Sequence, residues 1–365
     1  MRRFVAALSF ALVLAGCAHT ELDPDQEPRS RYSGQAGESP VGIIPEGVLR
    51  DATRGKDVLM TVEYPTRTTG NPLIIFSHAY ASSHRDYVGL SAHWASQGYV
   101  VIKPSHADAA RTLRGVDDQW QSQTPADWRE RVRDITFILD SLDQLERTYP
   151  ELQGKIDRTK IGVGGHSYGA FTASLVAGVR TFPGGTSYAD PRVKALLVMA
   201  PQGPDESRGL TRESWTELRV PTLFMTGGED QGASESQTPE WRRQAFELSP
   251  AGDKWLVVIA GARHGSFTGR MSAMMPTVPR EEVDHRPVIG DPRDDPRRNP
   301  INEPERTDPR RPGRESMGAL RERGLFNNIK VISLAFWDAY LRGDAEGRTV
   351  LENAGSRGGI ELVKK

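Results

Sequence analysis

Residues 161–170 read Ile-Gly-Val-Gly-Gly-His-Ser-Tyr-Gly-Ala, an apolar run that breaks into glycines and then into a serine. Within this stretch, residues 165–169 match the pattern G-x-S-x-G. The pattern is typical of a nucleophile elbow, where a strand turns sharply into a helix and exposes the serine hydroxyl. Glycine is needed on either side because a side chain there would clash with the neighbouring strand or the entering helix. Ser167 is therefore predicted to be a nucleophile.

Short apolar strands and amphipathic helices alternate on both sides of this stretch. Strands are expected at residues 58–64, 72–76, 99–102, 160–163, 193–199, 220–225 and 254–259. Helices are expected at residues 85–97, 125–145, 170–177 and 325–341, the second of them capped by Thr124. This alternation predicts an α/β fold with a mainly parallel, doubly wound sheet and helices on both of its faces.

An acid and a base follow the serine in the order that a catalytic triad requires. Residues 221–230 read as a buried strand and a glycine turn that ends on Glu229 and Asp230. The next strand ends just before His264. A serine needs a base to become nucleophilic, and the base needs a carboxylate to fix its tautomer. We expect Asp230 to be that acid, with Glu229 as the adjacent alternative.

Three other histidines compete with His264 for the role of base. His78, His106 and His166 also lie at the ends of expected strands. His166 precedes the nucleophile and is expected to point into the packing, whereas His106 could line a pocket. Only His264 follows the last expected strand, so it is the predicted base.

Residues 76–80, Phe-Ser-His-Ala-Tyr, leave an early strand and are expected to help bind an oxyanion. Acyl transfer creates negative charge on the carbonyl oxygen, which backbone amides stabilise when they are already in place. The residue after the nucleophile, Tyr168, is expected to supply one amide. Tyr80 is expected to supply the second, with Ala79 as the alternative.

Taken together, these segments resemble an α/β-hydrolase of the dienelactone-hydrolase-like and platelet-activating-factor-acetylhydrolase-like branch. The matching segments span roughly residues 45–270 and comprise residues 76–80, 165–169, 200–204, 226–230 and 261–264. Two positions depart from relatives, which commonly have His-Gly at His78-Ala79 and in some cases cysteine at Ser167. The serine argues against a true dienelactone hydrolase.

The resemblance implies an α/β-hydrolase fold and a serine hydrolase of carboxylic esters. Its substrate would be a small-molecule or lipid-like ester, and no metal or other cofactor is expected. A peptidase or thioesterase would use the same triad, and an envelope binding or scaffold lipoprotein would keep the fold without turnover. The net charge of −1 gives no reason to expect nucleic acid as a partner, and the oligomeric state is not predicted.

The start of the chain resembles a bacterial lipoprotein precursor. Residues 1–17 form a predicted signal peptide, with basic residues, an apolar run and Leu-Ala-Gly-Cys as a lipobox over residues 14–17. The alternative is a soluble secretory signal that contains Cys17, the only cysteine of the chain, by chance. Lipidation of Cys17 predicts attachment to the bacterial cell envelope, and Ala18 after it favours the outer membrane over the inner.

Composition sets the expected domain boundaries. Residues 18–42 are rich in charged residues, proline, serine and glycine and read as a flexible tether. Residues 43–350 are expected to form one hydrolase domain, and residues 351–365 a tail. Residues 271–314 interrupt the domain with proline, arginine and acidic residues and are expected to be a surface insertion. A lid over the active site is the alternative interpretation of this insertion.

Overall fold

The computed structural model describes residues 30–109, 125–232, 234–269 and 317–365. It divides the chain into a first unit that ends at Ser30 and a second that runs from Arg31 to Lys365. The predictions for the signal peptide, the lipobox, the first part of the tether, the Thr124 cap and residues 271–314 lie outside the described residues. Among the described residues, no helix is long and apolar enough to cross a membrane.

A nine-stranded sheet is formed by the described residues of the second unit, in the order β1-β2-β4-β3-β5-β6-β7-β8-β9. The strands are β1 (Val41–Asp51), β2 (Lys56–Pro65), β3 (Asn71–Ser77), β4 (Val100–Pro104), β5 (Ile156–His166), β6 (Val193–Met199), β7 (Thr222–Glu229), β8 (Lys254–Arg263) and β9 (Ile360–Lys364). The six neighbours from β4 to β8 pair in parallel, whereas β1, β2 and β9 pair antiparallel. The predicted mainly parallel sheet is confirmed.

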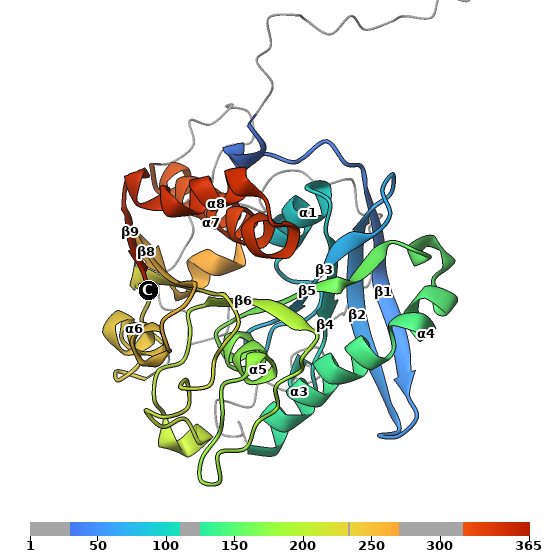
Figure 1. The fold of residues 1–365 in the computed structure, drawn as a ribbon, viewed down its shortest axis with the longest axis horizontal. Coiled ribbons are helices and arrows are strands. Elements are labelled where there is room, and N and C mark those ends of the chain that lie inside the picture. Colours follow the sequence, from blue (N-terminus) through green and yellow to red (C-terminus); the bar gives the residue numbers. More distant parts are fainter. Residues whose placement is uncertain (1–29, 110–124, 233, 270–316) are drawn as a thin grey trace, which may run out of the picture. The chain divides into compact units, whose positions relative to one another are not determined.

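Helices pack on both faces of this sheet (Figure 1). The helices are α1 (Val88–Ser96), α3 (Pro125–Asp140), α4 (Leu142–Thr148), α5 (Tyr168–Ala177), α6 (Pro239–Leu248), α7 (Met317–Trp337) and α8 (Ala345–Glu352). One core cluster joins the sheet to α3, α4, α5 and α6, and the other joins it to α1, α7 and α8. Along β3, Leu73 and Ile75 face the first cluster while Ile74 and Phe76 face the second. The predicted α/β-hydrolase fold is confirmed.

The folded unit begins earlier than the composition predicted, because residues 31–42 are not all tether. Tyr32 is only 5% exposed, and its hydroxyl lies 3.0 Å from Asp338 Oδ2. Arg31 Nε donates to the same carboxylate at 2.7 Å. This segment is attached to the domain by one buried aromatic residue and one ion pair. It has no periodic pattern of apolar residues, so its composition did not indicate that it is folded.

Residues 351–365 are part of the domain and not a tail. They complete α8 and then form β9, which pairs with β8 and closes one edge of the sheet. Only Ile360 of this strand is buried, so the sequence carries no run of apolar residues there. The strand β1 at the opposite edge was also not predicted, because a register shift between Ile44 and Gly47 interrupts its alternation.

The predicted helix over residues 125–145 contains a break. It is divided at Ser141 into α3 and α4, although the apolar residues expected to face the sheet are buried in both parts. The last predicted helix, residues 325–341, is helical throughout but begins earlier, since α7 starts at Met317 and passes into a π-helical turn over Asp338–Arg342. The carboxylate of Asp338 in this turn accepts hydrogen bonds from both Arg31 and Tyr32.

Candidate active site

Ser167 occupies the sharp turn between β5 and α5. Its backbone has φ 55° and ψ −116°, a strained conformation for a residue with a side chain. The N–H of Ser167 donates to the carbonyl of Met199 at the end of β6 at 2.9 Å, and its own carbonyl accepts from Phe171 in α5. The serine is partly exposed although its neighbours in sequence are buried. The structure therefore has the strand-turn-helix geometry that the sequence predicted.

The two glycines of the motif leave no room for a side chain. A Cβ atom on Gly165 would lie 2.3 Å from the carbonyl carbon of Gly169. A Cβ atom on Gly169 would lie 2.0 Å from the carbonyl oxygen of Ser77 at the end of β3. The turn is therefore compressed between the start of α5 and the neighbouring strand.

His264 and Asp230 meet at the carboxyl ends of adjacent strands. β7 ends at Glu229 and β8 ends at Arg263, so Asp230 and His264 each come directly after a strand. His264 Nδ1 lies 2.8 Å from Asp230 Oδ1. Asp230 is fully buried, and Thr226 Oγ1 donates to its other oxygen at 3.0 Å. An ionised carboxylate only accepts hydrogen bonds, so this contact puts the proton on Nδ1 and leaves Nε2 as the basic nitrogen.

Glu229, the alternative acid, pairs with arginines. Its side chain is 45% exposed and accepts from Arg263 Nε at 2.9 Å. The hydrogen bond from Arg263 lowers the pKa of this carboxyl group, and Arg321 adds to the effect. The structure therefore brings Asp230 to the histidine and leaves Glu229 in a surface ion pair.

His264 lies next to the elbow, against the residue that precedes Ser167. The rings of His166 and His264 lie 4.7 Å apart, centroid to centroid. His166 is buried, lies 2.9 Å from the Tyr87 hydroxyl through Nδ1 and packs on Phe267, as expected for a packing residue. Among the described residues, no hydrogen bond joins the Ser167 hydroxyl to His264. Such bonds often tighten only when a substrate is bound.

Arg242 is a residue of this site that sequence reasoning missed. It lies in α6, is 1% exposed, and its Nε is 3.0 Å from Asp230 Oδ1. Its Nη1 donates to the carbonyls of Ala200 at 3.0 Å and Pro201 at 3.1 Å. Burial lowers the pKa of the guanidinium, and the charge of Asp230 opposes that effect. Its position in the sequence could have revealed it. Arg242 lies one helical turn before the buried Phe246, on the side of the amphipathic helix α6 that faces the protein core.

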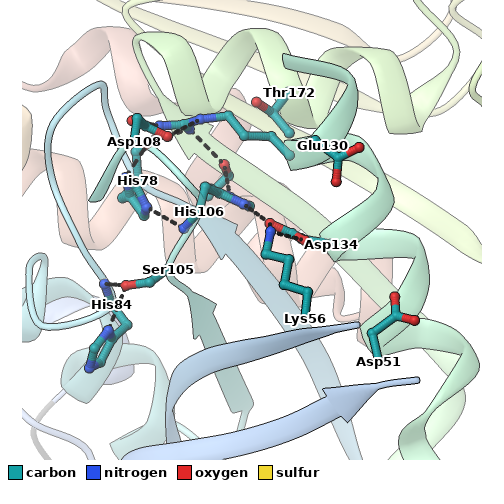
Figure 2. Close-up of polar contacts among 12 residues, drawn as sticks. Asp51, Lys56, His78, His84, Ser105, His106, Asp108, Glu130, Asp134 and Thr172 are labelled. Atoms are coloured by element: carbon teal, nitrogen blue, oxygen red, sulfur yellow. Dashed lines mark hydrogen bonds and ion pairs between the residues drawn. The ribbon is translucent and has the colours of Figure 1, made fainter. Parts of the chain in front are cut away.

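A second Ser-His-Asp arrangement lies inside the molecule. Ser77 Oγ is 2.9 Å from His106 Nε2, and His106 Nδ1 is 2.9 Å from Asp134 Oδ2. Each of these three residues is at most 2% exposed, so the arrangement has no access for a substrate. Figure 2 shows His106 pointing to Asp134, which Lys56 also contacts. His106 therefore belongs to a buried polar network.

The charges in this buried network compensate one another. Burial alone would raise the pKa of Asp134, but His106 and Lys56 outweigh that effect and lower it to about 2. Burial is also the main reason that the pKa of His106 is lowered. The described residues contain no cluster of three or more His, Cys, Asp or Glu side chains that would hold a metal ion. Ion pairs and hydrogen bonds among Ser77, His106, Asp134 and Lys56 make up the network.

Tyr80 and Tyr168, the predicted oxyanion residues, lie beside each other. Their rings contact edge to face with centroids 6.1 Å apart. The alternative amide, that of Ala79, donates to the Tyr87 hydroxyl at 3.2 Å. Relatives commonly have His-Gly where this chain has His78-Ala79, but the backbone of Ala79 does not adopt a conformation that requires glycine. The positive φ of the loop falls instead on Ala81, at 57°.

Comparison with known proteins gives one family match. The model of the family described as platelet-activating factor acetylhydrolase, isoform II, matches residues 56–137. No curated protein matches the chain. The matched residues run from β2 through β3, α1 and β4 into α3 and include the loop of Tyr80, but not Ser167, Asp230 or His264. The match supports this branch of the α/β-hydrolases and a hydrolase that acts on esters.

Proposed function

We propose that this α/β-hydrolase of the platelet-activating-factor-acetylhydrolase-like branch is a serine hydrolase of carboxylic esters, with Ser167 as nucleophile, His264 as base and Asp230 as orienting acid. The observation that carries the proposal is the partly exposed serine on a strained elbow, beside a histidine bonded to a buried carboxylate. The buried Ser77 arrangement lacks both the strained turn and the exposure. These differences favour Ser167 as the reactive serine.

The proposed reaction has two halves. In the first, Ser167 Oγ attacks the ester carbonyl carbon while His264 Nε2 takes the hydroxyl proton, and buried Asp230 stabilises the imidazolium that forms. The tetrahedral intermediate then collapses, its carbon–oxygen bond breaks, and His264 returns the proton to the leaving alcohol. In the second half, a water molecule gives a proton to His264 Nε2 as it attacks the acyl carbon. The second tetrahedral intermediate then collapses, the bond from the carbon to Ser167 Oγ breaks, His264 returns the proton to Oγ, and the carboxylic acid leaves.

The amides of Tyr168 and Tyr80 are the proposed donors to the tetrahedral oxyanion. Tyr168 is the first residue of α5, and the amino-terminal end of a helix stabilises negative charge through its oriented peptide groups. Tyr80 follows β3, which neighbours β5 in the sheet, and its ring contacts that of Tyr168. The amide of Ala79, the alternative donor, donates to the Tyr87 hydroxyl at 3.2 Å.

The direct test is ester hydrolysis. A panel of p-nitrophenyl esters of rising chain length, with a peptide p-nitroanilide as control, would identify the substrate class. We expect hydrolysis of at least the short esters by the wild type and its loss in Ser167→Ala. Ser174→Ala is the matched control, because Ser174 lies in the same helix and only bonds a helix carbonyl. Turnover that survives Ser167→Ala, or none by the folded wild type, would overturn the proposal.

We propose in addition that the mature protein is held at a bacterial envelope membrane by a lipidated Cys17. The basis is the apolar segment and the Leu-Ala-Gly-Cys sequence over residues 14–17. Several acyl chains on one cysteine would bind a bilayer firmly, since each buried methylene contributes about 0.8 kcal/mol. Ala18 supports the outer membrane in this proposal.

A further inference from the structure

The peptide group between Ala79 and Tyr80 is held from its carbonyl side. The Ala79 oxygen accepts from His78 Nδ1 at 2.7 Å, from the Ser82 N–H at 3.2 Å and from Arg131 Nη2 at 3.3 Å. In a trans peptide, the carbonyl and the N–H point in opposite directions. The three donors that fix the carbonyl therefore also fix the direction of the Tyr80 N–H.

The proton on His78 is set by its other nitrogen. The backbone N–H of His106 donates to His78 Nε2 at 3.1 Å, so Nε2 must accept and Nδ1 must carry the hydrogen. Figure 2 shows the contact between the His78 ring and His106. His78 is 2% exposed, and burial holds its pKa well below the usual range, as a neutral ring requires. His78 is thus committed to donating to the Ala79 carbonyl.

Arg131, in α3, donates hydrogen bonds to the same loop. Its Nη1 donates to the His78 carbonyl at 2.7 Å, and its Nε and Nη2 form a two-pronged pair with Asp108 at 3.0 and 2.5 Å. Asp108 Oδ2 in turn accepts the Ala81 N–H at 3.2 Å. Arg131 therefore binds the carbonyls of the two residues before Tyr80, and its partner Asp108 binds the N–H of the residue after it. Both members are buried, and a fork of this kind fixes direction as well as distance.

The same guanidinium also reaches the second proposed donor. The Arg131 carbon Cζ lies 4.5 Å from the centre of the Tyr168 ring, within the range of a cation–π contact. Tyr168 lies directly after the nucleophile, whereas Ala79 belongs to the loop after β3. One buried side chain thus connects the two segments that must be aligned with each other. Within the described part of the chain, Arg131 forms no hydrogen bond or ion pair with Ser167 or His264.

We propose that Arg131, clamped by Asp108, is a positioning residue of the oxyanion site: it fixes the Ala79–Tyr80 peptide so that the Tyr80 amide meets the oxygen on which charge develops. This inference rests on the proposed function. Preorganised amides stabilise a transition state because they need no rearrangement, and loss of one such donor lowers kcat by about 10²–10³-fold. If the Tyr80 amide points in the wrong direction, kcat should fall by an amount that approaches this range.

The test replaces Arg131 by lysine, which keeps the positive charge beside Asp108 but cannot span two carbonyls and the carboxylate together. We expect kcat for a p-nitrophenyl ester to fall by on the order of 10²-fold with KM changed little, because the alignment matters in the transition state. The inhibition constant of a trifluoromethyl ketone, whose adduct carries the oxyanion, should rise in parallel. Arg133→Lys is the matched control, since Arg133 lies two residues on in α3 and is 62% exposed.

A purely structural role would give a different result. If Arg131→Lys only loosened the fold, titration of active sites with a fluorophosphonate would show fewer sites, each with wild-type kcat and inhibitor affinity, and the inference would be overturned. If Arg131→Lys fails to fold, Arg131→Met with Asp108→Asn removes both charges at once and undergoes the same measurements. Turnover that persists in Ser167→Ala would overturn the proposed function together with this inference. Wild-type kcat per site in the folded Arg131 variant would overturn this inference alone.

Discussion

Replacing Asp230 by asparagine tests the acid of the proposed triad. The carboxylate holds His264 Nδ1 at 2.8 Å and is itself held by Thr226 and Arg242. Asparagine keeps the shape of the side chain but has an NH2 group and no charge. If the NH2 group faces Nδ1, it forces the proton onto Nε2, where His264 can no longer act as base.

The catalytic effect should be large. A wrong imidazole tautomer costs about 10⁴-fold in kcat in the best-known serine triad, which corresponds to about 5 kcal/mol of transition-state stabilisation. We expect Asp230→Asn to lose activity on this scale. Glu229→Gln should stay close to wild type, because Glu229 lies in an exposed pair with Arg263.

Arg242 adds an effect on stability. Asp230→Asn leaves this guanidinium, which is 1% exposed, without its counter-charge. Breaking a buried ion pair from one side costs roughly 3–5 kcal/mol. We expect about 3 kcal/mol here, because the carbonyls of Ala200 and Pro201 continue to accept from Arg242. The melting temperature should fall by about 5–10 °C.

The assay combines ester hydrolysis with thermal melts. The double change of Asp230→Asn with Arg242→Gln removes the unpaired charge and should recover part of the lost stability without recovering activity. That separation distinguishes a catalytic from a structural role of Asp230. Near-wild-type kcat in Asp230→Asn, with collapse in Glu229→Gln, would refute the assignment and transfer the role to Glu229.

Three further outcomes are expected. Gly169→Ala should abolish hydrolysis and destabilise the fold by about 1–3 kcal/mol, because its Cβ would lie 2.0 Å from the Ser77 carbonyl oxygen; an active, stable variant would contradict the described elbow. Burial holds the pKa of His78 and of His166 well below 6.5, so the unfolded chain binds protons there that the folded chain does not. The free energy of unfolding should thus fall by about 1.4 kcal/mol per histidine for each pH unit below about 6.5, and an unchanged denaturant midpoint from pH 7 to 5.5 would argue against this. Cys17→Ser should release the protein from the membrane fraction or leave it unprocessed, and mature protein that stays bound would show that lipid on Cys17 is not the anchor.

The parts of the site that could be predicted are those in which chemistry and chain geometry act over a few residues. The elbow needs glycine at positions 165 and 169 for steric reasons that the structure reproduces. Asp230 and His264 follow strands that are recognisable as apolar runs, and parallel strands bring their carboxyl ends to one edge of the sheet.

The parts that could not be predicted depend on single contacts between distant residues. Arg131 and Arg242 look like ordinary helix arginines in sequence, yet each is buried against backbone carbonyls far away along the chain. Nor does spacing reveal the Ser77, His106 and Asp134 arrangement, which only the packing of α3 on the sheet assembles. Polar residues in a core are matched by individual hydrogen bonds and follow no period, so local patterns carry little information about them.

The most direct test of the central claim is to map the site of covalent modification by a fluorophosphonate. Wild-type protein treated with the reagent, digested and analysed by mass spectrometry should carry one adduct, on Ser167, and Ser167→Ala should carry none. His264→Ala should react far more slowly, because the base that activates the serine is missing. An adduct on Ser77 or another serine, or none on wild-type protein that melts cooperatively, would contradict the assignment of Ser167 as nucleophile.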